Sequence, residues 1–239
     1  MTKFVAEIRE EFGHLLEEKE FIVDKTGVKT LEIVGASFVA DEPTIFGKIN
    51  HDYIERELAW YQSKSLYVKD IPGKVPEIWE QVADKDGIIN SNYGFLIWSQ
   101  YNGNQYLNVI EELRKNPNSR RAVMIYNRPS MHNDYCRNGR SDFICTNAVQ
   151  YLIRNNVLEV VVQMRSNDVV FGYRNDYAWQ SHVASLMVDM LKLEKYIITW
   201  QVGSLHVYER DFWRVEAWYK TGNHLMTKKN WNEVKDDYR

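Results

Sequence analysis

The chain has 239 residues, 44% hydrophobic content and a net charge of −3, values that allow one large globular domain. We expect a single domain over 1–239, because no repeat, low-complexity tract or proline-rich linker interrupts the sequence. The acidic balance excludes a general basic field for nucleic acid, so any phosphate site must be local. No signal-type opening and no long apolar run is present, which predicts a cytoplasmic protein without a membrane span.

Apolar spacing predicts most of the N-terminal elements. Helices are expected over 2–18 and 52–66, and the β-branched residues within 21–40 predict strands that flank a turn. A further helix is expected over 105–116, where Asn116-Pro117 would end it.

The second half of the chain contains a hairpin signal. Two β-branched runs, 143–153 and 157–165, are separated by Asn155-Asn156, and asparagine tolerates the positive φ of a tight turn. A long helix is then expected over 174–193. A strand over 197–208 and a helix near 211–220 follow it. This mixture, without βαβ regularity, predicts an α+β fold with a mixed or antiparallel β-sheet flanked by helices.

Cys145 is the first candidate for chemistry, on the strand expected over 143–153. Alone, such a cysteine is more often a buried structural residue. The pairs Arg120-Arg121 and Arg165-Ser166 favour a site, because guanidinium groups with a hydroxyl can hold a phosphate. An arginine near a thiol also lowers its pKa and favours the nucleophilic thiolate. Cys136 lies among charged residues and is expected to be exposed and incidental.

These motifs, taken in order, resemble those of the thymidylate synthase family. The resemblance rests on the arginine pair, on Cys145 with Gln150 five residues later, on the stretch from Arg165 to Gly172, and on His206 with Tyr208. Lys25-Thr26-Gly27-Val28-Lys29-Thr30 resembles the family's phosphate loop, and Glu57-Leu58-Ala59-Trp60 and Ile78-Trp79 resemble two further motifs. The match is collinear over most of the chain, and that combination makes it specific.

The resemblance implies a mechanism and a set of roles. Cys145 would add to C6 of a pyrimidine nucleotide, so that C5 attacks the one-carbon unit of 5,10-methylenetetrahydrofolate, with no metal. Glu57 would organise water and shuttle protons to the base. The enzyme would be a homodimer, since Arg120 and Arg121 would reach the phosphate from the partner subunit. The other substrate-binding residues would be Lys25, Arg165, Ser166, Asn167, Asp168, His206 and Tyr208, and the folate would contact Trp79, Asp168 and Gly172.

One departure from the family concerns the base. The family has Asn four residues after the glycine that Gly172 matches, whereas this chain has Asp176. Cytosine presents an acceptor at N3 and a donor at N4, which suits a protonated carboxyl group or a shared proton. The change, with the stretch MRSNDVVFGYRNDYAW, resembles the phage-encoded deoxycytidylate hydroxymethylases. That resemblance implies conversion of dCMP to 5-hydroxymethyl-dCMP, in the cytoplasm of a bacterial host, and leaves a nucleotide-synthesis complex as a possible partner.

Two further departures concern the end of the reaction. Val82 replaces the family's second Trp, and the polar segment 235–239 replaces its apolar tail. Both changes would let water reach the exocyclic methylene intermediate that forms on the base and leave a hydroxymethyl group.

Three alternatives remain open. If Asn175 rather than Asp176 faces the base, thymidylate synthase or a dUMP hydroxymethylase is favoured. A zinc deaminase could use His132, Cys136 and Cys145, but its motif is absent. A nucleotide- or RNA-binding module without catalysis is compatible with the aromatic residues and the arginine clusters, although the net charge argues against it.

Overall fold

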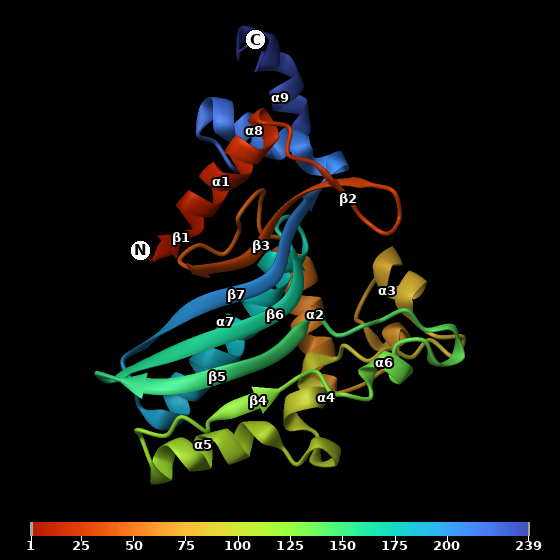
Figure 1. Ribbon diagram of the computed structural model, residues 1–239. Helices are drawn as coiled ribbons and strands as arrows, with labels where there is room; N and C mark the ends of the chain where they lie inside the picture. Colours follow the sequence, from red (N-terminus) through yellow and green to blue (C-terminus); the bar gives the residue numbers. More distant parts are fainter. Residues whose placement is uncertain (1, 239) are drawn as a thin grey trace. The chain divides into compact units, whose positions relative to one another are not determined.

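The computed structural model describes residues 2–238 (Figure 1). The chain divides into two compact units. The first unit comprises residues up to 49 together with 165–181 and 197 onward, and the second comprises 50–164 and 182–196. Strand β6 (Val157–Asp168), helix α7 (Gly172–Leu191) and strand β7 (Lys195–Tyr208) each run from one unit into the other.

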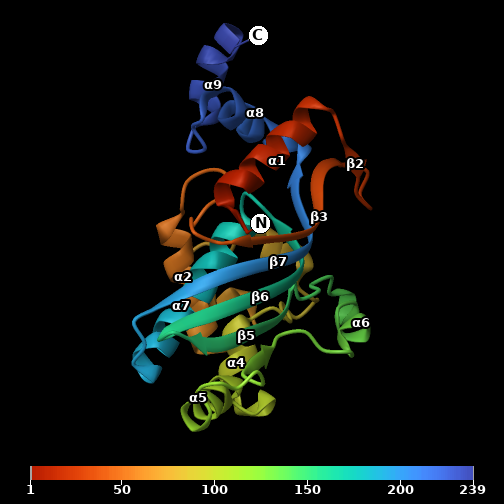
Figure 2. The ribbon, with the colours of Figure 1, turned by 60° about the vertical axis from the view of Figure 1, so that its left-hand side comes forward.

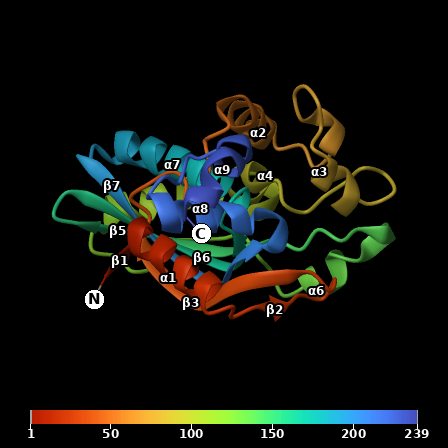
Figure 3. The same ribbon diagram turned by 90° about the horizontal axis from the view of Figure 1, so that it is seen from above.

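The first unit is built on strand β3 (Lys29–Val39), which pairs antiparallel with β7 and with the short β2 (Ile22–Val23). The two-residue strand β1 (Lys3–Phe4) adds a parallel pair with β3. Helix α1 (Val5–Glu17) lies against β3 and against α8 (Phe212–Thr221), as seen from above in Figure 3. The 3-10 turn η4 (Glu209–Asp211) precedes α8, and α9 (Lys228–Val234) and η5 (Lys235–Tyr238) follow it.

Helix α1 packs in this way because Val5, Ile8 and Phe12 share one face and are fully buried. The ring of Phe12 meets Phe46 edge to face. Arg9, on the same helix, donates to both carboxylate oxygens of Glu42 at 2.7 and 2.6 Å. This bidentate pair and the aromatic contact fix the segment that leads out of β3.

The second unit contains the hairpin of β5 (Thr146–Arg154) and β6 (Figure 2). Strand β4 (Val123–Ile125) pairs with β5 (Figure 1). The hairpin turn is Asn155-Asn156, and both residues have positive φ. Its helices are α2 (His51–Ser63), α3 (Glu77–Val82), α4 (Tyr93–Trp98), α5 (Gln105–Lys115) and α6 (Met131–Asp134), with 3-10 turns η1 (Val68–Asp70), η2 (Gln100–Asn102) and η3 (Arg137–Gly139).

The expected α+β class, with mixed strand pairing and flanking helices, is confirmed. The helix expected over 2–18 begins at Val5, the one expected over 52–66 ends at Ser63, and the boundary next to the candidate nucleophile was also wrong. The strand expected from residue 143 begins at Thr146, so Cys145 lies at a bend just before β5 and not on it. The pairing with β6 starts at Thr146 with Met164, and its register is irregular between Thr146 and Ala148. No helix among residues 2–238 is long and apolar enough to cross a membrane.

Candidate active site

The second unit carries the candidate nucleophile. Cys145 is half-buried, and its Sγ lies 3.8 Å from the carbonyl oxygen of Phe143. The strand register pairs Thr146 with Met164, which are the chain neighbours of Cys145 and Arg165. Cys136, by contrast, is exposed in the segment between α6 and η3, as expected.

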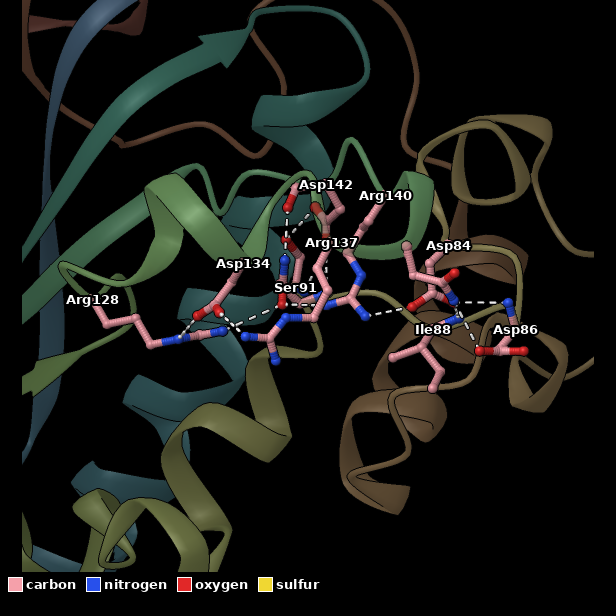
Figure 4. A network of polar contacts seen from close by, with 11 residues as sticks. Asp84, Asp86, Ile88, Ser91, Arg128, Asp134, Arg137, Arg140 and Asp142 are labelled. Atoms are coloured by element: carbon pink, nitrogen blue, oxygen red, sulfur yellow. Dashed lines mark hydrogen bonds and ion pairs between the residues drawn. The ribbon is translucent and has the colours of Figure 1, made fainter.

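A buried polar network holds the segment that leads to Cys145 (Figure 4). The carboxylate of Asp142 accepts from Asn90 N at 2.6 Å, from Ser91 N at 2.8 Å and from Ser91 Oγ at 2.6 Å. Arg140 donates to Asp84 at 2.6 Å and to Asn90 Oδ1 at 2.7 Å. Because Asp142 lies three residues before Cys145, these bonds fix the approach of the chain to the thiol.

Tyr93 is a site residue that the sequence analysis missed. Its hydroxyl accepts a hydrogen bond of 3.0 Å from Thr146 Oγ1, and Thr146 directly follows Cys145. The ring is buried between Tyr61 and Tyr126, at centroid distances of 5.4 and 5.2 Å. Tyr93 therefore places a phenol next to the nucleophile's backbone.

Glu57 is held by a chain of hydrogen bonds within the second unit. Trp79 Nε1 donates to Tyr53 Oη at 2.8 Å, and Tyr53 Oη donates to Glu57 Oε1 at 2.6 Å. Glu57 is only 6% exposed, and burial raises its pKa to about 7, although hydrogen bonds from Tyr53, Trp79 and Tyr61 act in the opposite direction. Such a carboxyl group can exchange protons near neutral pH. The spacing of Tyr53 four residues before Glu57 on a helix was the signal that could have identified this partner.

The raised pKa of Glu57 predicts a pH dependence of stability. A carboxyl group that binds its proton more tightly when folded stabilises the fold below about pH 4.5, and this contribution is lost as the pH rises through about 7. Urea unfolding at several pH values should therefore show that the free energy of unfolding falls by about 3 kcal/mol between about pH 4.5 and 7. Glu57→Gln should remove the fall, whereas Glu55→Gln, at an exposed position on the same helix, should keep it. If the free energy of unfolding changes with pH equally in wild type and Glu57→Gln, the prediction is wrong.

The arginine pair lies just before β4 in the second unit. Gln150 Nε2 donates to the carbonyl oxygen of Arg120 at 2.9 Å, so the glutamine of the cysteine motif holds the backbone of the pair. Arg121 forms an ion pair of 3.0 Å with Glu112, and its side chain is 80% exposed. Both guanidinium groups therefore remain accessible from outside this unit.

The first unit carries the residues expected to recognise the base. Asn167 Nδ2 donates to Asp176 Oδ2 at 2.8 Å, and Asn167 Oδ1 lies 3.3 Å from Trp200 Nε1. Asn167 is 3% exposed, so its amide orients the carboxyl group of Asp176 rather than lying open to solvent. A Cβ on Gly172 would lie 3.0 Å from Asn167 Nδ2, which explains why a glycine stands beside this pair.

The remaining predicted residues of the first unit have separate local roles. Asp168 accepts from the backbone N–H groups of Val170 and Phe171, each at 3.1 Å, and so shapes the turn into α7. His206 Nδ1 lies 3.3 Å from the carbonyl oxygen of Ser204, and its ring packs edge-on against Tyr208 at 5.0 Å. A proton on Nδ1 would leave Nε2 as an acceptor for a hydroxyl group.

The expected phosphate loop is a preformed turn. Asp24 Oδ1 accepts from Thr26 N at 2.7 Å, from Thr26 Oγ1 at 2.6 Å and from Val28 N at 3.1 Å. The hydrogen bond from the Thr26 side chain is the main reason that the pKa of Asp24 is lowered. This turn presents an exposed Lys25, and Arg165 is likewise exposed, with Ser166 half-buried beside it in the chain.

Among residues 2–238, no group of three or more His, Cys, Asp or Glu side chains is placed to hold a metal ion. The second unit carries a thiol and a buried carboxyl group of raised pKa, and the first unit carries an oriented aspartate and two exposed cations. Those groups suit covalent catalysis on an anionic substrate.

Comparison with known proteins defines the class. The family model described as thymidylate synthase matches residues 9–234, and the chain belongs to this family. It is 58% identical over 234 residues to deoxycytidylate 5-hydroxymethyltransferase of Enterobacteria phage T4, with 95% of each chain covered. The enzyme of the same name from phage T2 is 58% identical over 235 residues, covering 95% of this chain and 96% of that one. Thymidylate synthase of Francisella tularensis subsp. holarctica is 26% identical over 208 residues, covering 80% and 76%.

Proposed function

We propose that this protein is a deoxycytidylate 5-hydroxymethyltransferase. It would transfer the one-carbon unit of 5,10-methylenetetrahydrofolate to C5 of dCMP, with addition of water, to give 5-hydroxymethyl-dCMP and tetrahydrofolate. The observation that carries the proposal is the aspartate at position 176, whose Oδ2 is held by Asn167 at 2.8 Å. The relatives of the same name, at 58% identity, support the same substrate.

The contact with Asn167 also supports the register of α7. Consecutive helical residues point about 100° apart, so Asp176 and Asn175 face different directions. Because Oδ2 of Asp176 accepts from the amide, the proton of a neutral carboxyl group belongs on Oδ1. That O–H can donate to N3 of cytosine, while a carboxyl oxygen accepts from the N4 amino group.

The covalent steps balance without a metal or an oxidant. The Cys145 thiolate adds to C6, and the electrons reach C5, which attacks the methylene carbon of the folate. Loss of the C5 proton and departure of tetrahydrofolate give an exocyclic methylene group. Water adds to that carbon, and the thiolate then leaves. Glu57, with its pKa near 7, would move protons to and from the base through water.

The binding roles follow the family motifs. We assign the phosphate to Lys25, Arg165 and Ser166, the deoxyribose hydroxyl to His206 and Tyr208, and the folate to Trp79, Asp168 and Gly172. The whole chain would act as one catalytic domain, in the cytoplasm of a bacterial host, as phage relatives suggest.

Product identification tests the proposed reaction. Incubation with dCMP and methylenetetrahydrofolate should give 5-hydroxymethyl-dCMP by mass spectrometry, and dUMP in a parallel reaction should be used far less. A methylated product, or a preference for dUMP, would instead identify a thymidylate synthase or a dUMP hydroxymethylase.

We further propose that the active enzyme is a homodimer in which Arg120 and Arg121 serve the partner subunit's phosphate site. An inactive Arg121→Ala protein mixed with an inactive Cys145→Ala protein should then regain activity. Random exchange of subunits would restore about one quarter of the wild-type rate, because half of the dimers are mixed and each has one intact site. Mixed dimers that form, as seen by native mass spectrometry, but stay inactive would contradict the shared site.

A further inference from the structure

Asp142 is a buried carboxyl group of the second unit to which none of the family roles applies. Its side chain is only 6% exposed, and it lies three residues before Cys145 in a segment without helix or strand. Burial of a carboxylate is unfavourable unless hydrogen bonds replace the water that it loses. The partners in those hydrogen bonds show which part of the chain the carboxylate holds.

Four hydrogen bonds join Asp142 to one short segment, Asn90-Ser91 (Figure 4). Oδ2 of Asp142 accepts from both backbone N–H groups of that segment, and Oδ1 accepts from the Ser91 hydroxyl group. In the opposite direction, Asn90 Nδ2 donates to the carbonyl oxygen of Asp142 at 2.9 Å. Side chain and backbone of Asp142 are therefore both fixed to the same two residues.

The segment Asn90-Ser91 leads directly into helix α4, and its neighbour Asn92 anchors it. Asn92 is fully buried and caps the helix by accepting from Phe95 N at 2.8 Å. Its amide nitrogen donates to the carbonyl oxygens of Trp60 and Ser65 at 3.0 and 2.8 Å. The start of α4 is thus tied to the end of α2, and it offers Asp142 a fixed point of attachment.

A further hydrogen bond reaches the same stretch from the other side of the nucleophile. Thr146 Oγ1 donates to Tyr93 Oη, at the start of α4. Cys145 therefore lies between two residues, Asp142 and Thr146, whose side chains are both bonded to residues 90–93. A nucleophile reacts efficiently only when neighbouring contacts hold it in the productive geometry.

The negative charge of Asp142 does not explain its place near the thiol. A carboxylate close to a cysteine raises the pKa of the thiol and so disfavours the thiolate. Its hydrogen bonds, by contrast, act directly on the position of the segment that carries Cys145.

We propose that Asp142 is a positioning residue of the hydroxymethyl transfer, which holds Cys145 in place relative to helix α4. This inference rests on the proposed function. Loss of the hydrogen bonds should lower kcat, because displacement of a reacting group by about 1 Å can cost roughly 10²-fold in rate. The KM for dCMP should change little, because the phosphate and the sugar are assigned to other residues.

Two substitutions of Asp142 separate its hydrogen bonds from its charge. In Asp142→Asn the amide oxygen can accept from both backbone N–H groups, and the NH₂ group can donate to Ser91 Oγ. This variant keeps the geometry without the charge, so its kcat should stay within about fivefold of wild type. Asp142→Ala removes every bond of the side chain, and its kcat should fall about 10²-fold.

Asp134→Asn is the matched control. Its carboxylate belongs to the polar network of Figure 4 but accepts from Arg128 and Ser130, at 2.9 and 2.7 Å. Its kcat should stay within about twofold of wild type. Each kcat is measured per folded molecule, below the melting temperature of every variant, so that a loss of stability alone does not lower it.

Alkylation by iodoacetamide tests the position of the thiol without dCMP or folate. Every protein would carry Cys136→Ser, so that Cys145 is the only thiol that reacts. Asp142→Ala should react about fivefold faster than wild type, because the released segment opens more often to solvent. Asp142→Asn and Asp134→Asn should react at the wild-type rate.

The proposal is overturned if folded Asp142→Ala keeps kcat within about threefold of wild type or is alkylated at the wild-type rate. An equal loss of kcat in Asp142→Asn and Asp142→Ala would assign the effect to charge and would also overturn it. Should Asp142→Ala fail to fold, Ser91→Ala replaces it, with an expected loss of about tenfold in kcat; an unchanged kcat then overturns the proposal. If wild type gives no 5-hydroxymethyl-dCMP, the proposed function is wrong, and the alkylation rates still decide whether Asp142 holds Cys145.

Discussion

Replacing Cys145 with serine is expected to lower dCMP turnover by roughly 10⁴-fold or more, because the covalent route through C6 requires a thiolate. A serine hydroxyl fits the same bend before β5 but is a far weaker nucleophile near neutral pH. Binding of dCMP, measured by equilibrium dialysis, should change little because the phosphate and base contacts remain. Release of tritium from 5-³H-dCMP in the presence of folate should be lost with turnover.

Cys136→Ser is the matched control for this change. Cys136 is exposed, and its Sγ lies 3.5 Å from the carbonyl oxygen of Asn133, on a surface segment. Activity of the Cys136→Ser enzyme should stay within about twofold of wild type. If that variant is inactive while Cys145→Ser retains turnover, the nucleophile has been wrongly assigned.

The sequence predicted those elements whose signals are local. The hairpin was predicted because Asn155-Asn156 combines a turn signal with two β-branched runs, and both residues do have positive φ. Strand β1 could not be predicted, because two residues pair with β3 only through a contact distant in sequence. Helix α9 was missed because its surface is polar and a single residue, Trp231, is buried.

The end of the chain is another segment whose contacts the sequence did not predict. The polar segment 235–239 was expected to seal the pocket poorly. Residues 235–238 form the turn η5, in which Tyr238 packs against Trp231 at 6.1 Å, and Arg239 lies outside the described residues. The effect of this segment on sealing stays a prediction.

The sequence proposed a set of site residues but gave no indication of which side chains would be their partners. Family motifs gave Cys145, Glu57 and Asp176, and gave Asn167 as a substrate-binding residue. The hydrogen bond from the Asn167 amide to Asp176 was not expected. Tyr53 lies in the helix expected over 52–66, but the hydrogen bond of 2.6 Å from its hydroxyl to Glu57 was not predicted. Such pairings join groups through geometry, and residue types alone leave many of them possible.

The choice of base should depend on Asp176. Asp176→Asn is expected to cut dCMP turnover by several orders of magnitude, because a mismatched buried polar pair costs about 1–3 kcal/mol and loss of general-acid help adds about 10²–10⁴ in rate. The relative use of dUMP should rise, since its N3–H donor and O4 acceptor suit an amide. Steady-state kinetics with both nucleotides would measure the change.

Two further measurements decide whether Asp176 acts as proposed. If the active complex holds a proton between the carboxyl group and cytosine N3, turnover of dCMP should fall as the pH rises, because high pH removes that proton. The use of dUMP by Asp176→Asn should lack this fall, since an amide does not titrate. Asn175→Ala, one residue away on α7, should change the preference between dCMP and dUMP much less. If Asp176→Asn keeps full dCMP preference while Asn175→Ala loses it, Asn175 rather than Asp176 faces the base. That outcome would favour dUMP as the substrate.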